Sequence, residues 1–144
     1  MVSAAQIVEA LGGRNVLRER LADYRAIIER ARAGLPYAAL VAVAGRYAIP
    51  RETLARVLHL PARTHARRKK ERRLRPDESD RRLRLSRVAA MAEEALGAHD
   101  KAGRWLQKPN RALGGVVPID LLDTDLGAQE VETILMRIEY SVYS

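Results

Sequence analysis

The chain of 144 residues contains no cysteine and no phenylalanine, and aromatic residues make up only 4% of it. The absence of cysteine excludes disulfide bonds, thiolate metal sites and cysteine catalysis. Because aromatic residues are scarce, the core must consist mainly of leucine, valine, isoleucine and alanine, and an apolar fraction of 47% is enough to build one. Alanine, leucine and arginine are abundant and few runs are typical of strands, so the composition predicts an all-α fold.

Long uncharged segments are missing as well. The longest, residues 33–45, is too short to cross a bilayer. Residues 1–13 lack the basic start and apolar centre of a signal peptide. We therefore expect a cytoplasmic protein that does not insert into a membrane.

Patterns of catalytic residues are equally scarce. The three histidines, His59, His65 and His99, do not share a helical face at the spacing of metal ligands. The sequence has no Ser–His–acid grouping and no glycine-rich phosphate loop. We expect a protein that is not an enzyme and that needs neither a metal nor a cofactor.

Charge is unevenly distributed along the chain, which carries 26 basic and 18 acidic residues. Counted by segment, the net charge is +4 over residues 1–62, +8 over residues 63–87 and −4 over residues 88–144. This asymmetry predicts one part that faces nucleic acid and another that faces a different partner. The alternative is that the arginine content merely reflects an arginine-rich organism.

Prolines, glycines and capping residues divide the chain into predicted helices. The expected spans are residues 3–11, 21–33, 36–47, 50–58, 62–73, 76–96 and 99–108, followed by a short helix from residue 118 and a long one from about residue 125. In the second span we expect Ile28 to point inward. The third is apolar on almost every side, so it should be buried. Together with the wide apolar arc of residues 77–96, it predicts a protein that is at least a homodimer.

A three-residue turn, residues 59–61, joins two short helices and fits a helix-turn-helix. The second of these helices is strongly basic, and such a helix can enter the major groove, where arginine reads guanine and other cations bind phosphates. The candidate DNA-binding residues are Arg63, Thr64, Arg67, Arg68, Lys69 and Lys70.

Two histidines depart from the usual helix-turn-helix pattern. His59 occupies a turn position that is often glycine, and His65 occupies a position that is usually aliphatic and buried. The alternatives to specific DNA reading are salt-sensitive binding without sequence preference and a fold that serves chiefly as a dimerising scaffold.

The last helix is amphipathic. Its apolar side consists of Val131, Ile134, Leu135, Ile138 and Val142, and charged residues occupy the other side. The start of this helix is marked by Asp123, Thr124 and Asp125. These residues are explained more simply as capping groups than as part of a cation site with Asp120. The apolar, aromatic end of this helix either packs on its own domain or enters a partner.

Two stretches resemble a known family. The C-terminal residues Trp105, Leu106, Pro109, Asn110, Leu113, Gly114, Gly115, Pro118, Leu121, Leu122, Gly127, Val131, Leu135, Arg137, Ile138 and Tyr140 are similar to the toxin-binding domain of the Xre/MbcA/ParS antitoxins. The helix-turn-helix segment resembles the Xre-type domain of the same family. The resemblance implies an Xre-like helix-turn-helix domain over residues 1–75, a connecting helix over residues 76–97 and a toxin-binding domain over residues 98–144.

The resemblance also implies a function. The partner would be a RES-domain toxin that depletes NAD, and the antitoxin would block the toxin's active-site cleft with its C-terminal helix and tail. The implied toxin-binding residues are Glu130, Glu132, Thr133, Met136, Arg137, Glu139, Tyr140, Tyr143 and Ser144. The helix-turn-helix would let the protein regulate its own operon. The alternative is a stand-alone DNA-binding regulator whose C-terminal domain serves oligomerisation.

Overall fold

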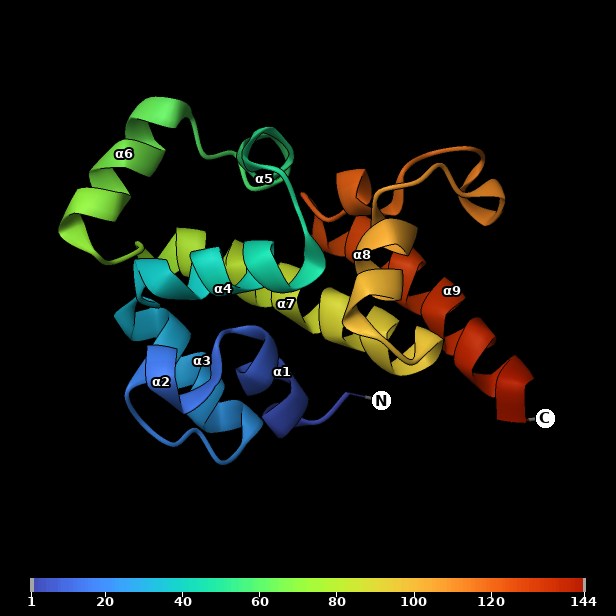
Figure 1. Cartoon of the computed structure of the whole chain (residues 1–144), viewed down its shortest axis with the longest axis horizontal. Helices are drawn as coiled ribbons and strands as arrows, with labels where there is room; N and C mark the ends of the chain where they lie inside the picture. The colour runs from blue at the N-terminus through green and yellow to red at the C-terminus, as the bar shows by residue number, and fades with distance from the viewer. Residues whose placement is uncertain (1, 144) are drawn as a thin grey trace.

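The computed structural model describes residues 2–143, and it describes side chains up to Ser141. Over these residues the chain forms helices and no strand, which confirms the predicted all-α fold (Figure 1). The α-helices are α1 (Ala4–Ala10), α2 (Gly13–Leu17), α3 (Tyr24–Ala33), α4 (Tyr37–Tyr47), α5 (Arg51–Val57), α6 (Ala62–Glu71), α7 (Pro76–Leu96), α8 (His99–Leu106) and α9 (Asp125–Tyr143). Two short 3₁₀ helices, η1 (Arg111–Leu113) and η2 (Pro118–Leu121), precede α9. None of the described helices combines the length and the apolar character that crossing a membrane requires.

Local capping explains where the helices begin and end. Ser3 forms a capping box with Gln6 at the start of α1, and the Asp23 carboxylate accepts a hydrogen bond from the Ala26 N–H at the start of α3. Gly97 adopts a left-handed conformation and ends α7. Because Asp23 is the cap, α3 begins three residues later than the sequence predicts.

Helix α2 is absent from the sequence prediction, in which Gly12 and Gly13 close the first helix after residue 11. Both glycines have positive φ, so the chain reverses within two residues and enters a new helical turn. A Cβ atom at Gly12 would lie 2.4 Å from Cγ2 of Val16, which shows how tight this turn is.

Helix α7 lies at the centre of the molecule. It packs against α1, α3 and α4 from the N-terminal half and against α8 and α9 from the C-terminal half (Figure 1). Leu85, Val88, Ala89 and Ala92 are completely buried along it, and the small alanines let neighbouring helices come close. The predicted wide apolar arc of α7 is therefore mostly covered within a single chain, although Leu83 and Met91 stay half-buried at a groove.

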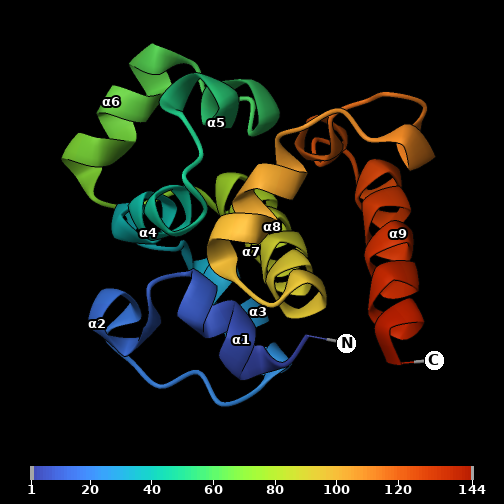
Figure 2. The ribbon, with the colours of Figure 1, turned by 45° about the vertical axis from the view of Figure 1, so that its right-hand side comes forward.

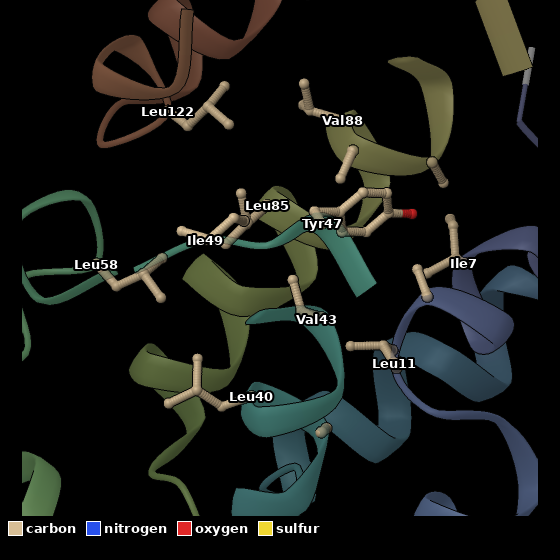
Figure 3. Close-up of a cluster of buried hydrophobic side chains, with 14 of the residues drawn as sticks. Ile7, Leu11, Leu40, Val43, Tyr47, Ile49, Leu58, Leu85, Val88 and Leu122 are labelled. Carbon is tan, nitrogen blue, oxygen red and sulfur yellow. The ribbon is translucent and has the colours of Figure 1, made fainter. Parts of the chain in front are cut away.

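The hydrophobic core runs without interruption from the N-terminal to the C-terminal helices. Figure 3 shows Ile7 and Leu11, from α1 and its end, on one side of Tyr47, Ile49 and Leu85 beside Tyr47, and Leu58 and Leu122 farther away on the other side. The helix-turn-helix and the C-terminal helices thus share one core with α7. The division into three segments at residues 75 and 97 stays a prediction.

Two predicted core positions lie at the surface instead. Ile28 on α3 is 43% exposed and Val41 on α4 is 54% exposed. Helix α4 is apolar on almost every side, but neighbouring helices cover only the side that carries Ala39, Leu40 and Val43. Because the sequence of α4 has no polar side, it does not indicate which side of the helix is exposed to solvent.

A partly buried polar cluster ties α4 to α7. Arg46 donates two hydrogen bonds to the Glu93 carboxylate, at 2.9 and 2.7 Å, and the buried Tyr47 hydroxyl donates a third at 3.0 Å. These contacts hold the pKa of Glu93 below its usual value, with the Arg46 hydrogen bonds as the main cause. Burial, reinforced by the Glu93 charge, raises the pKa of Tyr47.

Helix α8 crosses the end of α4 at Gly103. A Cβ atom at this position would lie 2.1 Å from the Tyr47 carbonyl oxygen, so the crossing requires glycine. Gln107 directly follows the last residue of α8, and its Nε2 donates to the Ala48 carbonyl at 3.2 Å.

We predict that Gly103→Ala destabilises the protein by about 1–3 kcal/mol or more, because backbone atoms rather than a flexible side chain would have to move. Gly45→Ala is the matched control, since Gly45 lies within α4 and a Cβ there meets nothing within 4 Å. The control should be neutral or stabilising by up to about 1 kcal/mol through helix propensity. Chemical denaturation of both variants checks this, and equal stabilities would contradict the close crossing.

Candidate nucleic-acid and partner interfaces

Helices α5 and α6 form the predicted helix-turn-helix. The connecting turn is anchored by the buried side chains of Leu58 and Leu60, and the Leu60 N–H donates to the Ala55 carbonyl at 3.0 Å. His59 has a φ of +50° in this turn, a left-handed conformation that favours glycine. Glycine is common at such a turn because it adopts this conformation easily. The turn has the same conformation here, with histidine in place of glycine.

The predicted DNA-binding residues on α6 differ in how far they are exposed to solvent. Arg63, Arg67, Lys69 and Lys70 are exposed, and Thr64 is half-buried. These residues remain available to bind DNA.

Arg68 was also predicted to be an exposed DNA-binding residue, but it is only 2% exposed. Its side chain is buried against α7, where its Nε lies 3.0 and 2.8 Å from the two oxygens of Glu78. Glu71 adds a second carboxylate at 3.3 Å. Burial alone would raise the pKa of Glu78, but the Arg68 hydrogen bonds and the Arg75 N–H outweigh it and hold this pKa below its usual value. Arg68 therefore fixes α6 on α7 instead of facing solvent.

His65 packs against an aromatic residue of α4. Its Nε2 lies 2.6 Å from the Tyr37 hydroxyl, and the two rings meet edge to face with centroids 5.3 Å apart. Burial lowers the pKa of His65, and the nearby cations Arg51, Arg82 and Lys69 lower it further. Tyr37 thus gives His65 a hydrogen-bond partner at a position where an aliphatic residue is usual.

Arg82 was not singled out in the sequence, yet it is only 1% exposed. Its Nη1 donates to the Glu78 carbonyl at 2.8 Å, whereas Nε and Nη2 have no hydrogen-bond partner among the described residues. Burial lowers its pKa to about 10. No sequence signal separates this arginine from its neighbour Arg81, because both lie in a run of charged residues.

Helix α9 begins at a tight corner after η2. The Thr124 hydroxyl accepts a hydrogen bond from the Gly127 N–H at 3.0 Å. A Cβ at Gly127 would lie 2.0 Å from the Leu121 carbonyl oxygen, so the corner requires glycine. The predicted apolar side is confirmed where Val131 and Leu135 are buried in the core, and Ile134 is buried beside Ala112 and Leu113.

Three of the predicted toxin-binding residues lie together on the outer side of α9. Glu130, Thr133 and Arg137 line a shallow depression of about 430 Å³ with Ala112 and Leu113 of the preceding segment. The acidic and basic side chains here are free to pair with a partner.

The remaining predicted residues lie elsewhere. Met136 and Tyr140 line a separate groove on the other side of α9, and Glu139 is half-buried. Glu132 was predicted to face a partner, but its carboxylate lies 2.6 Å from Nη2 of Arg87 on α7 and its side chain is only 19% exposed. The side chain of Tyr143 and the whole of Ser144 lie outside the described residues.

The helix-turn-helix and the C-terminal helices also meet through an ion pair and a contact between a histidine and a carboxylate. Arg56 on α5 lies 2.6 Å from Asp120 on η2, and His59 in the turn lies 3.8 Å from Asp123. Asp120 and Asp123 therefore face α5, while Thr124 caps α9. Within residues 2–143, no group of three or more histidine or carboxylate side chains could hold a metal ion.

The fold and these surfaces define a helix-turn-helix protein with an acidic, all-helical C-terminal part. Two family models match neighbouring stretches of the chain. Residues 26–87 match the antitoxin Xre-like helix-turn-helix domain, and residues 91–140 match the antitoxin Xre/MbcA/ParS C-terminal toxin-binding domain. The chain belongs to the Xre family of antitoxins, as its sequence motifs indicated.

Relatives from three bacteria carry the description antitoxin Xre. The Pseudomonas putida protein is 40% identical over 80 residues, which is 55% of this chain and 50% of the relative. The Photorhabdus laumondii protein is 42% identical over 69 residues, 47% of each, and the Yersinia enterocolitica protein is 36% identical over 98 residues, 67% of this chain and 66% of the relative. The chain thus spans about half the length of the first two relatives.

We predict that Arg68 and Arg67, neighbours on α6, have opposite roles. Arg68→Met should destabilise the fold by about 3–5 kcal/mol, because it leaves the buried Glu78 carboxylate without its cation. Arg67→Met should change stability by less than about 0.5 kcal/mol, because Arg67 is exposed. Thermal and denaturant unfolding measure both, and a stable Arg68→Met variant would show that the ion pair does not anchor α6.

Proposed function

We propose that the protein is an antitoxin that neutralises a RES-domain, NAD-depleting toxin and regulates its own operon. The observation that carries the proposal is the exposed outer side of α9, within a stretch that matches a toxin-binding domain. Glu130, Thr133 and Arg137 surround a depression there, and it is open to a partner.

The proposed mechanism is steric. A cleft that binds NAD needs basic groups for the two phosphates, and the exposed carboxylate of Glu130 on the outer side of α9 could pair with such a group. The outer side of α9 and the residues that follow Tyr140 would lie over this cleft and exclude the substrate. The nicotinamide chemistry belongs to the toxin, so the antitoxin itself needs no cofactor.

The proposed DNA contact uses the exposed cations of α6. Base edges or phosphates are within reach of Arg63, Arg67, Lys69 and Lys70. Arg68 instead attaches the buried side of α6 to Glu78 on α7. A homodimer would present two such helices to a two-fold operator.

A stand-alone regulator with a C-terminal oligomerisation part is the second candidate. It is supported by Met136 and Tyr140, which are large apolar side chains exposed on α9. This candidate predicts that no toxin binds, so the toxin experiment below separates the two.

We predict that Glu130→Arg combined with Thr133→Arg weakens toxin binding at least tenfold, because two long cations would fill the depression and face a basic cleft. Glu94→Arg combined with Asn15→Arg is the matched control, since it makes the same charge change at exposed positions on other helices. Co-purification with a RES toxin, and rescue of growth when that toxin is expressed, give the readout. If the first variant binds and rescues as well as the control, the outer side of α9 is not the inhibitory surface.

We predict that DNA affinity falls steeply with salt and that the exposed cations of α6 cause this dependence. Replacing Arg63, Arg67, Lys69 and Lys70 by alanine should reduce the slope of log affinity against log salt by about 0.9 for each phosphate that the variant no longer binds. A variant with Arg14, Arg20, Lys101 and Lys108 replaced by alanine removes the same charge from other exposed positions and should keep most of the slope. Fluorescence anisotropy on promoter DNA measures both, and identical slopes would show that α6 is only solvated surface.

A further inference from the structure

A second basic surface lies just beyond the end of α6. Three arginines from two distant parts of the chain line a hollow of about 350 Å³ there. Arg30 belongs to α3, and Arg72 and Arg73 directly follow α6. The other lining residues are Ala33, Gly34 and Pro36. The described lining therefore contains cations and no carboxylate.

Main-chain contacts hold the two parts of the chain together. The Leu74 N–H donates to the Leu35 carbonyl at 2.9 Å, and an antiparallel bridge joins Pro36 to Arg73. The segment before α4 and the segment after α6 therefore lie side by side. This backbone pairing brings the cations of both segments to one site.

Carbonyl groups at the end of α3 orient two of the guanidinium groups. Nη1 of Arg30 donates to the Gly34 carbonyl, and Nη2 of Arg73 donates to the Ala33 carbonyl. Arg30 also has a carboxylate partner, because its Nε lies 3.0 Å from Glu19. A guanidinium has five N–H groups, and a carbonyl has no net charge. Both arginines therefore keep N–H groups for another acceptor, and the charge of Arg73 is not neutralised.

Gly34 leaves room for this arrangement. It has a φ of +100°, and a Cβ there would lie 2.8 Å from Nε of Arg73 and 2.6 Å from the Leu74 carbonyl oxygen. A side chain at this position would displace the Arg73 guanidinium or separate the two paired segments. The glycine that ends α3 thus also shapes the hollow.

Arg72 contributes a charge that no contact within the described chain uses. Its side chain is exposed, and it has no hydrogen-bond or ion-pair partner among the described residues. Its backbone has a φ of +61°, the left-handed conformation in which the chain leaves α6. This cation is therefore available for a ligand.

Three arginines around one hollow suit a phosphate. A guanidinium donates parallel N–H bonds to the oxygens of a phosphate group, and such charge-assisted bonds are short and strong. All three arginines lie within residues 26–87, the stretch that matches the helix-turn-helix domain.

The position of the hollow indicates which phosphate it binds. The hollow adjoins α6, whose exposed cations form the proposed DNA contact, and a helix of ten residues is only about 15 Å long. Backbone phosphates border the major groove on both sides. DNA that lies against α6 therefore brings phosphates to the end of this helix.

We infer that the hollow binds a phosphate of the DNA backbone beside the bases that α6 faces. The inference rests on the proposed DNA contact of α6 and extends it to residues outside that helix. A phosphate held by Arg72 and Arg73 fixes the position and direction of α6 on the duplex but carries no sequence information. Figure 2 shows α6 and α9 on opposite sides of the molecule, so this contact is remote from the proposed toxin surface.

Substitution of Arg72 tests the inference, because its side chain has no described contact to lose. Arg72→Ala should weaken DNA binding about tenfold and reduce the slope of log affinity against log salt by about 0.9. The loss should be equal for promoter DNA and unrelated DNA. Arg111→Ala is the matched control, since it removes the same charge from an exposed position on η1 and should leave both quantities nearly unchanged. Fluorescence anisotropy measures the affinities, and circular dichroism verifies that both variants are folded.

Phosphate ethylation identifies the group that is bound. A phosphate whose ethylation blocks binding of the wild-type chain, but no longer affects Arg72→Ala, is the one that Arg72 contacts. The same experiment with Arg67→Ala should identify different phosphates, because Arg67 lies on α6 itself. Calorimetric titration with inorganic phosphate shows whether the hollow binds free phosphate in the absence of DNA.

The outcomes separate this inference from the proposed function. If the wild-type chain binds no DNA, the proposed regulation of an operon fails and the inference fails with it. If the wild-type chain binds DNA while Arg72→Ala keeps its affinity, salt slope and ethylation pattern, only the inference is overturned. Binding of inorganic phosphate that depends on Arg72, together with unchanged DNA binding by Arg72→Ala, would assign the hollow to free phosphate instead.

Discussion

The structure depends on the burial of one helix, α7, which has neighbours on nearly every side. Helices from both halves of the chain pack on it, and the fully buried Leu85, Val88, Ala89 and Ala92 contribute to that packing. Each buried aliphatic side chain as large as valine or leucine contributes about 1.5–3 kcal/mol, so neither half forms its core without α7. The helix-turn-helix and α9 therefore have a fixed relative position, and Arg56 and His59 reach the acidic residues of the C-terminal part across it.

Polar contacts decide which charged side chains remain free. On α6, Arg68 is held by Glu78, and this pair orients the helix so that Arg63 and Arg67 stay exposed. On α9, Glu132 is held by Arg87, and the carboxylate of Glu130 stays available. In both helices one charged residue positions the element while neighbouring charged side chains stay exposed. The net charge of a segment therefore overstates the charge that a partner meets.

The sequence predicted the helices well where local chemistry sets their ends. Ser3, Gly34 and Gly97 cap or stop helices as expected, because these effects involve only a few neighbouring residues. Prediction failed where distant residues decide the outcome. The burial of Arg68, the pairing of Glu132 and the exposure of Ile28 depend on which helix lies opposite, and periodicity along one helix does not contain this information. The family was identified from motifs, and both family models match it.

The proposed steric block is tested most directly by the kinetics of inhibition. NAD consumption by a purified RES toxin is measured at increasing concentrations of the chain, and the series is repeated over a range of NAD concentrations. If α9 and the residues after Tyr140 exclude the substrate from the cleft, more NAD should weaken the inhibition, and the apparent inhibition constant should rise linearly with NAD. An inhibition constant that does not change with NAD, or no inhibition at all, would contradict the account.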